Sequence, residues 1–568
     1  MPTEFRPGRF LRTGAWLIAL LVGFTHAWAT RFWLSPDALN YLDVSSAYLR
    51  HDFHSALNAY WSPAFSWILA GAISLFHPAP HSESTLLHLV NFAGLLFSLA
   101  AFEFFFISFL AAQENLSRVF STSPALSDSS TRLLGYAIFF STSFFLLADP
   151  SSTTPDVWLV AETWLIAGLL LRIFLHRGGW NRFALLGLAL GCAYLTKTFY
   201  FPLVFVFLPA AWIASGATRK TLLQAAAALA IFAAIATPWI AAISAAKHRF
   251  TIGDVGKLTL VINYADLQQP PFWQGENGSG TPAHPVHLIL TSPRVFEFAS
   301  PIGGTYPPGY DWSYWMEGVR PDFSFRAALR VFRQSAGTFF KLALVQSEFA
   351  VAALVLFFCA PHKRRILEAL RLQSFLWLPP LAACAAYAVV LVEGRYVAPF
   401  APLLWLAAFS CLLAQAGLST RAARALVLAA VCFTGLRLAK FTEENAAAIF
   451  SAPRNTDAAA AAALRQAGVR PGDRLALLCP TEELHWARQL GARIVSEMPL
   501  GQESVFWPAS DDVKSRVFSA FASSGAKFVI TMDPPLGPAR TGWLPLAQTD
   551  FFAHPLSRSP RLPTAPYH

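Results

Sequence analysis

The sequence predicts a polytopic α-helical membrane protein of about eleven transmembrane helices, followed by a small C-terminal α/β or α+β domain outside the membrane. Of its 568 residues, 55% are hydrophobic and only 13% are charged, and the mean hydropathy is +0.44. Soluble proteins carry about 25% charged residues, so this composition excludes an ordinary soluble enzyme. Apolar runs of about 17–25 residues, the length that a helix needs to cross a bilayer, recur along most of the chain.

Eleven apolar runs are predicted as spans, because backbone groups inside a bilayer must be hydrogen-bonded within a helix. A shorter run at 64–76 is predicted to form an interfacial or re-entrant helix. The predicted spans lie at residues 11–30, 86–111, 133–148, 157–175, 183–198, 200–216, 222–244, 342–360, 373–392, 396–416 and 423–440.

Basic residues predict which side of the membrane each loop occupies, since Lys and Arg gather in cytoplasmic loops. The segment 361–371, "PHKRRILEALR", is the most basic loop of the chain. Together with the other basic turns it predicts a cytoplasmic N-terminus and a C-terminus outside. Three loops then also lie outside: 32–85, 149–156 and 245–341.

Composition and loop charge together predict the inner membrane of a bacterium, with the C-terminal domain in the periplasm. The net charge of +10 is explained by basic cytoplasmic loops and predicts no nucleic-acid partner. The same loops would attract the anionic headgroups of membrane lipids. Five of the six cysteines lie in apolar runs, so neither a disulfide framework nor a Cys/His metal site is predicted.

Residues 1–442 are predicted to form the transmembrane domain and residues 443–568 a separate extracytoplasmic domain. In the second part, "NTDAAAAAALRQAGVRPGDRLALLC" predicts a helix, a glycine-containing turn and a strand, and "GAKFVITMD" predicts another strand. The Pro-rich end "SRSPRLPTAPYH" predicts a disordered tail. No catalytic motif stands out in this domain.

Two aspartates at the outer ends of predicted spans are candidate catalytic residues. Asp37 follows the first span in "SPDALNYLD", where a carboxylate could take a proton from a substrate beside a lipid headgroup. Asp156, in "TTPD", begins another span, and two facing acids could also hold a divalent metal beside a phosphate. Both residues also fit helix starts, which favour Pro and Asp in the first turn. Asp43 and Asp52 are expected to be solvated or capping.

Two outer basic residues depart from the positive-inside pattern and are candidate ligands of a donor phosphate. Lys197 lies between apolar runs in "AYLTKTFYFP", where a charge is costly without a partner. Arg395, in "VEGRYVAPF", lies between two further spans and has the fork geometry that grips phosphate. The alternatives are an ion pair with Glu393 for Arg395, and snorkelling of either side chain to the interface.

The loop 245–341 carries the aromatic-rich stretch "FASPIGGTYPPGYDWSYWMEG". Trp312 and Trp315 are candidate substrate-binding residues, because aromatic faces stack on sugar rings or peptides. Anchoring of the loop at the membrane interface is the other interpretation of the same residues.

These motifs together resemble the membrane-embedded GT-C glycosyltransferases, the superfamily of the protein O-mannosyltransferases and lipid A aminoarabinose transferases. The resemblance covers about residues 10–440. In "PDALNYLDVSSAYL", Asp37 matches the family's acidic residue after the first span and Tyr41 its aromatic residue. Ala38 stands where a second acidic residue is usual.

Three further stretches resemble the same family in the same order along the chain. "TTPDVWLVAETWLIAGLLL" is similar to its second acidic turn, with Asp156 in place. "GLALGCAYLTK" is similar to a segment that ends in Thr-Lys, here at Lys197. "EGRYVAPFAPLLWLAA" resembles an Arg-Tyr corner, with Arg395 and Tyr396.

The resemblance implies an inverting transferase that moves a sugar from a polyprenyl-phosphate donor to a lipid, glycan or protein hydroxyl outside. Asp37 would take the proton of the acceptor, and Lys197 and Arg395 would stabilise the leaving phosphate. Asp156 would orient the acceptor or help bind a metal. Tyr41 and Tyr396 would lie beside the substrate. The resemblance requires no metal, and a divalent ion stays an open alternative.

Three other functions fit the same composition. A transporter or flippase of lipid-linked glycans would place charges near the midplane and show internal repeats. A polymerase or ligase of lipid-linked glycans would share the donor but not the fold. A non-catalytic envelope assembly protein would use its outer domain to bind a partner. Convergence of the four charged candidates on one outer site distinguishes the transferase from these alternatives.

Overall fold

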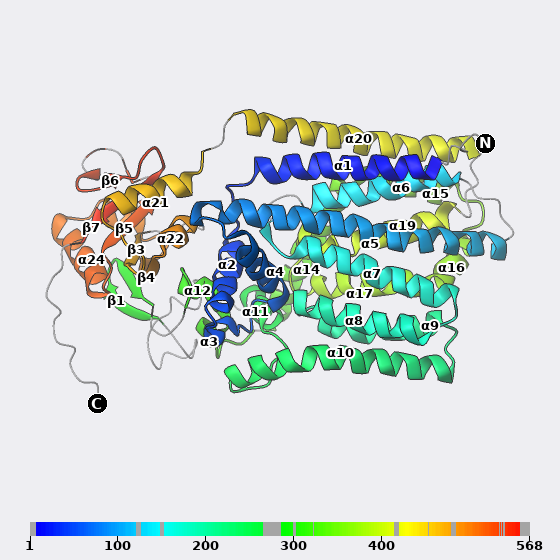
Figure 1. The fold of residues 1–568 in the computed structure, drawn as a ribbon, viewed down its shortest axis with the longest axis horizontal. Helices are drawn as coiled ribbons and strands as arrows, with labels where there is room; N and C mark the ends of the chain where they lie inside the picture. Colours follow the sequence, from blue (N-terminus) through cyan, green and yellow to red (C-terminus); the bar gives the residue numbers. More distant parts are fainter. Residues whose placement is uncertain are drawn as a thin grey trace.

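The computed structural model shows a helix bundle with a smaller, sheet-containing unit at one end (Figure 1). We call the end of the bundle that carries this sheet-containing unit the site end. The structure describes residues 7–120, 126–147, 153–264, 286–298, 303–321, 323–413, 420–451, 454–478, 484–532 and, apart from 536, 538 and 539, 534–556.

Five helices within the described residues are long and apolar enough to cross a membrane. A bent pair, α14 (Phe325–Val345) and α15 (Ser347–Cys359), meets at 89° and makes a sixth when it is counted as one span. The five are α1 (Pro7–Ala29), α5 (Glu83–Phe120), α7 (Asp156–Leu175), α10 (Arg219–Ala246) and α20 (Thr420–Phe450).

The other apolar runs form shorter or interrupted helices. Helices of 13–17 residues reach only about 20–26 Å at 1.5 Å per residue, less than the roughly 30 Å of a bilayer core. The count of eleven spans therefore stays a prediction. Hydropathy treats each apolar run as one continuous helix, whereas helices in the structure begin and end inside some of these runs. These helices are α6 (Asp128–Ser141), which ends in the π-turn η2 (Thr142–Leu146), α8 (Trp180–Thr196), α9 (Tyr200–Ala214), α17 (Ser374–Ala388) and α19 (Ala401–Leu413).

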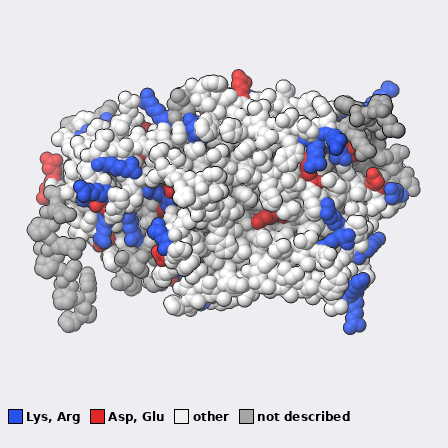
Figure 2. All heavy atoms as spheres, in the orientation of Figure 1, with Lys and Arg blue, Asp and Glu red and all other residues white. Residues whose placement is uncertain are grey.

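Charged side chains gather toward the two ends of the molecule, and the face in Figure 2 carries few of them in between. The N-terminus and the basic helix α16 (Lys363–Leu372) lie at the end opposite the sheet (Figure 1). An apolar belt between charged ends is the surface that a bilayer requires. The chain is therefore an integral membrane protein, while the compartment that each end faces stays a prediction.

The stretch after the first long helix folds into short helices at the site end. α2 (Pro36–Leu49) begins after Ser35, whose hydroxyl accepts a hydrogen bond from the Ala38 amide, so Asp37 lies in its first turn. Asp52 caps α3 (Phe53–Ala56), as predicted. α4 (Pro63–Phe76), the segment predicted to be interfacial or re-entrant, has 14 residues and packs on α2 and α5. The short 3₁₀ turn η1 (Pro80–Ser82) connects α4 to α5.

The sheet has seven strands in the order β1-β2-β4-β3-β5-β7-β6. Its centre is parallel: β3 (Arg474–Leu478) pairs with β4 (Arg493–Met498) and β5 (Phe528–Met532). β3 and β5 fall in the two segments predicted as strands. α21 (Thr456–Gln466) and α22 (His485–Leu490) pack on one face, and α23 (Glu503–Phe506) and α24 (Asp511–Ser523) on the other. β7 (Phe551–Pro555) and β6 (Leu544–Pro545) complete one edge.

The other edge of the sheet comes from the loop between α10 and α14. β1 (His287–Thr291) and β2 (Arg294–Glu297) form a hairpin, and β2 pairs with β4. The same loop supplies α11 (Val255–Tyr264), α12 (Pro307–Tyr310) and α13 (Trp312–Trp315) at the site end. The sheet thus draws on both predicted domains, and α20 runs through residue 442, so the domain boundary stays a prediction.

A buried ion network joins the sheet unit to the bundle. Arg488 of α22 is 9% exposed and contacts Asp43 of α2 at 2.6 Å and Glu83 of α5 at 2.8 Å. Asp43 also accepts hydrogen bonds from the amide and hydroxyl of Thr305. The expectation that Asp43 is solvated or capping is therefore wrong: its carboxylate is buried because a guanidinium 445 residues away neutralises it.

Replacing Arg488 by methionine is expected to lower the thermal unfolding temperature of the purified protein in detergent. The change leaves two buried carboxylates without their cation, which costs about 3–5 kcal/mol in comparable buried pairs. The matched control is Arg516→Met, which breaks an exposed pair with Asp512 and should stay within about 0.5 kcal/mol of wild type. Equal unfolding temperatures for the two variants would contradict the assigned role of the network.

Candidate active site

The four charged candidates lie together at the site end as two ion pairs. Arg395 Nη1 lies 2.8 Å from Asp37 Oδ2, and Lys197 Nζ lies 2.7 Å from Asp156 Oδ1. The residues come from α2, α7, the link between α8 and α9, and the short helix α18 (Gly394–Val397). Four segments that are distant in the sequence therefore meet in one place.

Arg395 uses its fork on several groups at once. Its Nε donates to Glu393 Oε2 at 2.7 Å, and its Nη2 donates to the Tyr396 hydroxyl at 3.3 Å. The predicted alternative, an ion pair with Glu393, thus exists beside the pair with Asp37. Burial disfavours the charge, but nearby Tyr396, Asp156, Asp37 and Glu393 raise the pKa of Arg395 above its usual value.

The Lys197–Asp156 pair is the more enclosed of the two. Asp156 is 2% exposed and also accepts a hydrogen bond from the Thr154 hydroxyl at 2.7 Å. Lys197 is 18% exposed, and its Nζ lies 3.9 Å from the centre of the Tyr396 ring. A charge buried here is stabilised by its partner and by the face of the aromatic ring.

Tyr396 connects the two pairs. Its hydroxyl accepts from Arg395 and its ring face meets Lys197. The ring also stacks on Tyr387, with centroids 5.2 Å apart, and Tyr387 in turn stacks on Phe199. The aromatic stack fixes the position of both cations at once.

Tyr41 and Tyr60 border the Asp37 side of the site. Tyr41 is 7% exposed and packs edge-on against Trp61 and Phe65. Burial, followed by the negative charges of Asp37 and Asp156, raises the pKa of Tyr41 well above its usual range. Burial and Asp37 also raise the pKa of Tyr60. Both phenols are therefore protonated donors at neutral pH.

The two tryptophan candidates differ in position. Trp315 is fully buried and donates its Nε1–H to the carbonyl of Pro307, inside the core shared with the sheet. Its predicted substrate contact is therefore wrong, because no face of the ring reaches solvent. Trp312 is only partly buried, and its ring centre lies 6.2 Å from that of Tyr60, so its substrate role stays a prediction.

Exposure separates the roles open to the carboxylates. The side chains of Asp37 and Glu393 are 32% and 39% exposed, whereas that of Asp156 is 2% exposed. Asp37 is therefore reachable from solvent, while Asp156 is enclosed by protein groups. Within the described ranges, no group of three or more His, Cys, Asp or Glu side chains is arranged to hold a metal ion.

Several residues of the site were not singled out from the sequence. Thr154, Tyr60 and Tyr387 carry no motif of their own, and Tyr387 lies in an apolar run that reads as membrane core. Thr154 and Tyr387 share a hydroxyl close to a predicted outer end of a span, whereas Tyr60 lies inside the predicted outer loop 32–85. Asp149, which begins the predicted outer turn 149–156, lies outside the described residues.

No protein-family model and no curated protein matches this sequence. Among solved structures, the chain is similar to the apo form of the Archaeoglobus fulgidus oligosaccharyltransferase, with a TM-score of 0.51 and 12% identity over 93% of this chain and 70% of that chain. The complex of that species' AglB with an inhibitory peptide and a dolichol-phosphate gives a TM-score of 0.50 and 13% identity, with the same coverage.

A second protein, ArnT from Cupriavidus metallidurans bound to undecaprenyl phosphate, is 12% identical and aligns over 96% of this chain and 98% of that chain, with a TM-score of 0.41. The oligosaccharyltransferase likeness shows the fold. The chain has the fold of that oligosaccharyltransferase, in agreement with the resemblance predicted from the sequence.

A double-mutant cycle on Asp156→Asn and Lys197→Met is expected to show strong coupling in unfolding free energy. Each single change leaves one buried charge unpaired, whereas the double change removes both charges, so the double variant should be more stable than the sum of the single losses predicts. Contacting residues couple by about 0.5–3 kcal/mol. Additive losses, measured by denaturant or thermal unfolding in detergent, would show that the pair does not exist in solution.

Proposed function

We propose that the protein is an inverting glycosyltransferase that moves a sugar from a polyprenyl-phosphate donor to a hydroxyl of an extracytoplasmic lipid, glycan or protein. The observation that carries this proposal is the accessible carboxylate of Asp37, held at 2.8 Å by Arg395 beside the enclosed Lys197–Asp156 pair. A reachable base and two cations in one place are what sugar transfer from a phosphate requires.

The proposed reaction is a single in-line displacement. The acceptor oxygen attacks the anomeric carbon from the face opposite the phosphate, and Asp37 takes the hydroxyl proton. The bond between the anomeric carbon and the phosphate oxygen breaks, and polyprenyl phosphate leaves with the bonding electrons. The configuration at the anomeric carbon inverts. General-base assistance of this kind contributes about 10²–10⁴-fold to a rate.

Arg395 and Lys197 are assigned to the donor phosphate. In the absence of substrate their charges are neutralised by Asp37, Glu393 and Asp156, which avoids leaving buried cations unpaired. A phosphate that enters the site would take donors of the Arg395 fork from the more exposed carboxylates. Asp37 would then be released toward the acceptor hydroxyl at the moment when the donor is in place.

Asp156 is assigned a positioning role and not a contact with the acceptor. Its carboxylate is almost fully buried and is satisfied by Lys197 and Thr154. It would hold the ammonium group of Lys197 against the face of Tyr396 and toward the phosphate. The proposed mechanism routes no step through a metal ion.

The aromatic residues around the acid are assigned to the sugar. Tyr41 and Tyr60 are protonated donors next to Asp37, and Trp312 offers a partly exposed ring beside Tyr60. Tyr396 is assigned to holding the side chains of Arg395 and Lys197 in position. Aromatic faces and phenol hydroxyls together suit the apolar faces and hydroxyls of a sugar ring.

The similar structures add support at the level of the fold. The Archaeoglobus fulgidus match is an oligosaccharyltransferase, and the structure of AglB from that species holds a dolichol-phosphate and an inhibitory peptide. A lipid phosphate donor and an outer acceptor fit the same fold here. The clustering of the candidate charges at one end of the bundle favours a transferase over a transporter, whose charges would lie near the midplane. A bacterial inner membrane with the site on the periplasmic side completes the proposal.

Asp37→Asn is expected to lower sugar transfer by about 10²–10⁴-fold, because the amide cannot accept the acceptor proton. Transfer is measured with a radiolabelled polyprenyl-phosphate sugar and membranes as the source of acceptor. The matched control is Asp52→Asn, which makes the same chemical change in the same loop but keeps the cap of α3, since Asn also caps helices. Equal activity of the two variants would remove Asp37 from the role of base.

Arg395→Lys is expected to weaken binding of polyprenyl phosphate by about 10–100-fold, since a charge-assisted hydrogen bond contributes about 1.5–3 kcal/mol and lysine lacks the fork. Binding is measured with the purified protein and a short-chain polyprenyl phosphate. Arg437→Lys is the control, because Arg437 pairs instead with the buried Glu348, between α15 and α20. Wild-type affinity in Arg395→Lys, or equal losses in both variants, would contradict the assignment.

A further inference from the structure

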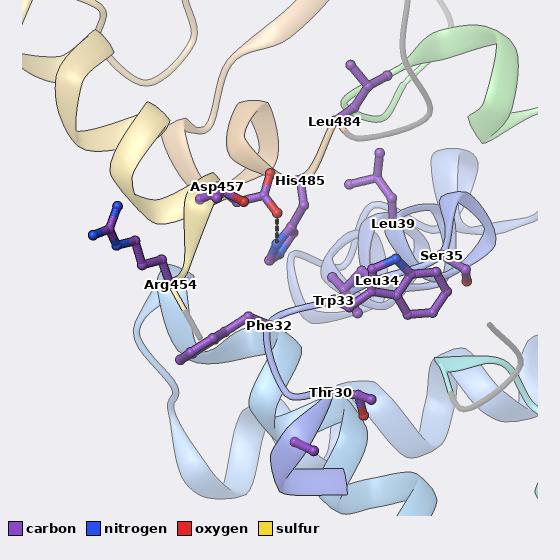
Figure 3. A pocket seen from close by; sticks show the side chains of 12 residues that line it. Thr30, Phe32, Trp33, Leu34, Ser35, Leu39, Arg454, Asp457, Leu484 and His485 are labelled. Carbon is purple, nitrogen blue, oxygen red and sulfur yellow. Dashed lines mark ion pairs between the residues drawn. The ribbon is translucent and has the colours of Figure 1, made fainter. Parts of the chain in front are cut away.

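A cavity lies where the end of the first long helix meets the sheet unit (Figure 3). Its volume is about 240 Å³, and Asp37 is not among the residues that line it. One wall is the segment after α1, including Phe32, Trp33 and Leu34, and the other wall comes from the starts of α21 and α22. A single water needs about 10–15 Å³ of such space, so this cavity takes a group of many atoms.

His485 carries the polar character of the cavity wall. The residue is 4% exposed, its ring points into the cavity in Figure 3, and its Nε2 has no hydrogen-bond partner among the described residues. Its Nδ1 lies 3.3 Å from the amide nitrogen of Gln489, which only donates, so Nδ1 accepts and Nε2 carries the proton. Burial, followed by the charge of Arg488, lowers the pKa of His485 to about 3, so the ring is a neutral donor at physiological pH.

An unmatched buried N–H donor is costly and is rare in folded proteins. The cavity therefore presents one N–H donor, His485 Nε2, that has no acceptor among the described residues and calls for an acceptor oxygen from a bound group. A bound group with an oxygen at this position would remove the penalty.

Two opposite charges flank the histidine. The Asp457 carboxylate accepts a hydrogen bond from the Trp486 amide and lies 3.9 Å from His485 Nδ1. Arg454 stands at the rim with an exposed side chain (Figure 3). One anion, one cation and one neutral donor thus line the same space.

The position of the cavity identifies the source of its ligand. Phe32 and Trp33 lie three and four residues after the end of α1 at Ala29, and Trp33 is 40% exposed. Aromatic residues in this place mark the boundary between the hydrocarbon and the headgroups of a bilayer. Leu34, Leu39 and Leu484 add apolar lining to the cavity. A ligand would therefore reach this cavity from the lipid headgroup layer.

We propose that this cavity binds the headgroup of an aminophospholipid, a phosphodiester that carries a primary ammonium group. The phosphate pairs with Arg454, the ammonium donates to Asp457, and His485 Nε2–H donates to a headgroup oxygen. An anionic headgroup would face the Asp457 carboxylate with a like charge, and a quaternary ammonium has no N–H to donate to it. The proposal is independent of sugar transfer at the Asp37 site.

The test is native mass spectrometry of the full-length protein in detergent with phosphatidylethanolamine, phosphatidylcholine and phosphatidylglycerol of identical acyl chains. The wild type is expected to bind phosphatidylethanolamine at least threefold more tightly than the other two. Asp457→Asn, which keeps the volume and the acceptor for Trp486, is expected to abolish this preference. His485→Phe is expected to weaken phosphatidylethanolamine binding at least threefold. Asp512→Asn, on the exposed side of α24, is the matched control and should keep the wild-type preference.

Three results would overturn the proposal. The first is equal binding of the three lipids by the wild type. The second is a preference for phosphatidylethanolamine in Asp457→Asn as strong as in Asp512→Asn. The third is displacement of the lipid by a soluble monosaccharide at millimolar concentration, which would make the cavity a glycan site. Thermal unfolding of each variant checks folding, and Asp457→Asn alone decides the case if His485→Phe does not fold.

Discussion

A charged side chain that is buried at the end of an apolar helix bundle has to be paired, because an unpaired buried ion costs several kcal/mol. Here this constraint joins segments that are remote in the sequence. Arg395 and Asp37 bring α18 to the start of α2, and Lys197 and Asp156 bring the α8–α9 link to the start of α7. Arg488 attaches the sheet unit to α2 and α5 in the same way. The geometry of the site follows from these pairs and from the aromatic stack on Tyr396.

The same pairing explains how the site can be both stable and reactive. The Asp156 pair is enclosed and serves as a fixed anchor, whereas the Asp37 pair is open to an entering group. A phosphate competes for Arg395 with two carboxylates of intermediate exposure, so the bound donor itself changes the partner of Asp37. In the proposed reaction, this exchange links the arrival of the donor to the release of the base.

Part of this arrangement could be predicted from the sequence, since Asp37, Asp156, Lys197 and Arg395 each place a charge at the outer end of an apolar run. The ion-pair partners of these residues could not be predicted. Glu393 is the acid nearest to Arg395 in the sequence, and no local pattern points from Arg395 to Asp37. Asp43 and Arg488 lie 445 residues apart, so their pairing has no sequence signal. The prediction for Trp315 was wrong because an aromatic-rich stretch has the same sequence pattern whether its rings contact a substrate or pack in a core. The hairpin β1–β2 joins the sheet only through tertiary pairing with β4.

The most direct test of the central claim is an assay of the purified wild-type protein with defined polyprenyl-phosphate sugars and an outer acceptor. We expect that the sugar moves to a hydroxyl, that one polyprenyl phosphate is released for each sugar transferred, and that the new linkage has the opposite anomeric configuration to the donor by NMR. Retained configuration, or consumption of a sugar diphosphate donor with no use of the monophosphate, would contradict the proposed reaction.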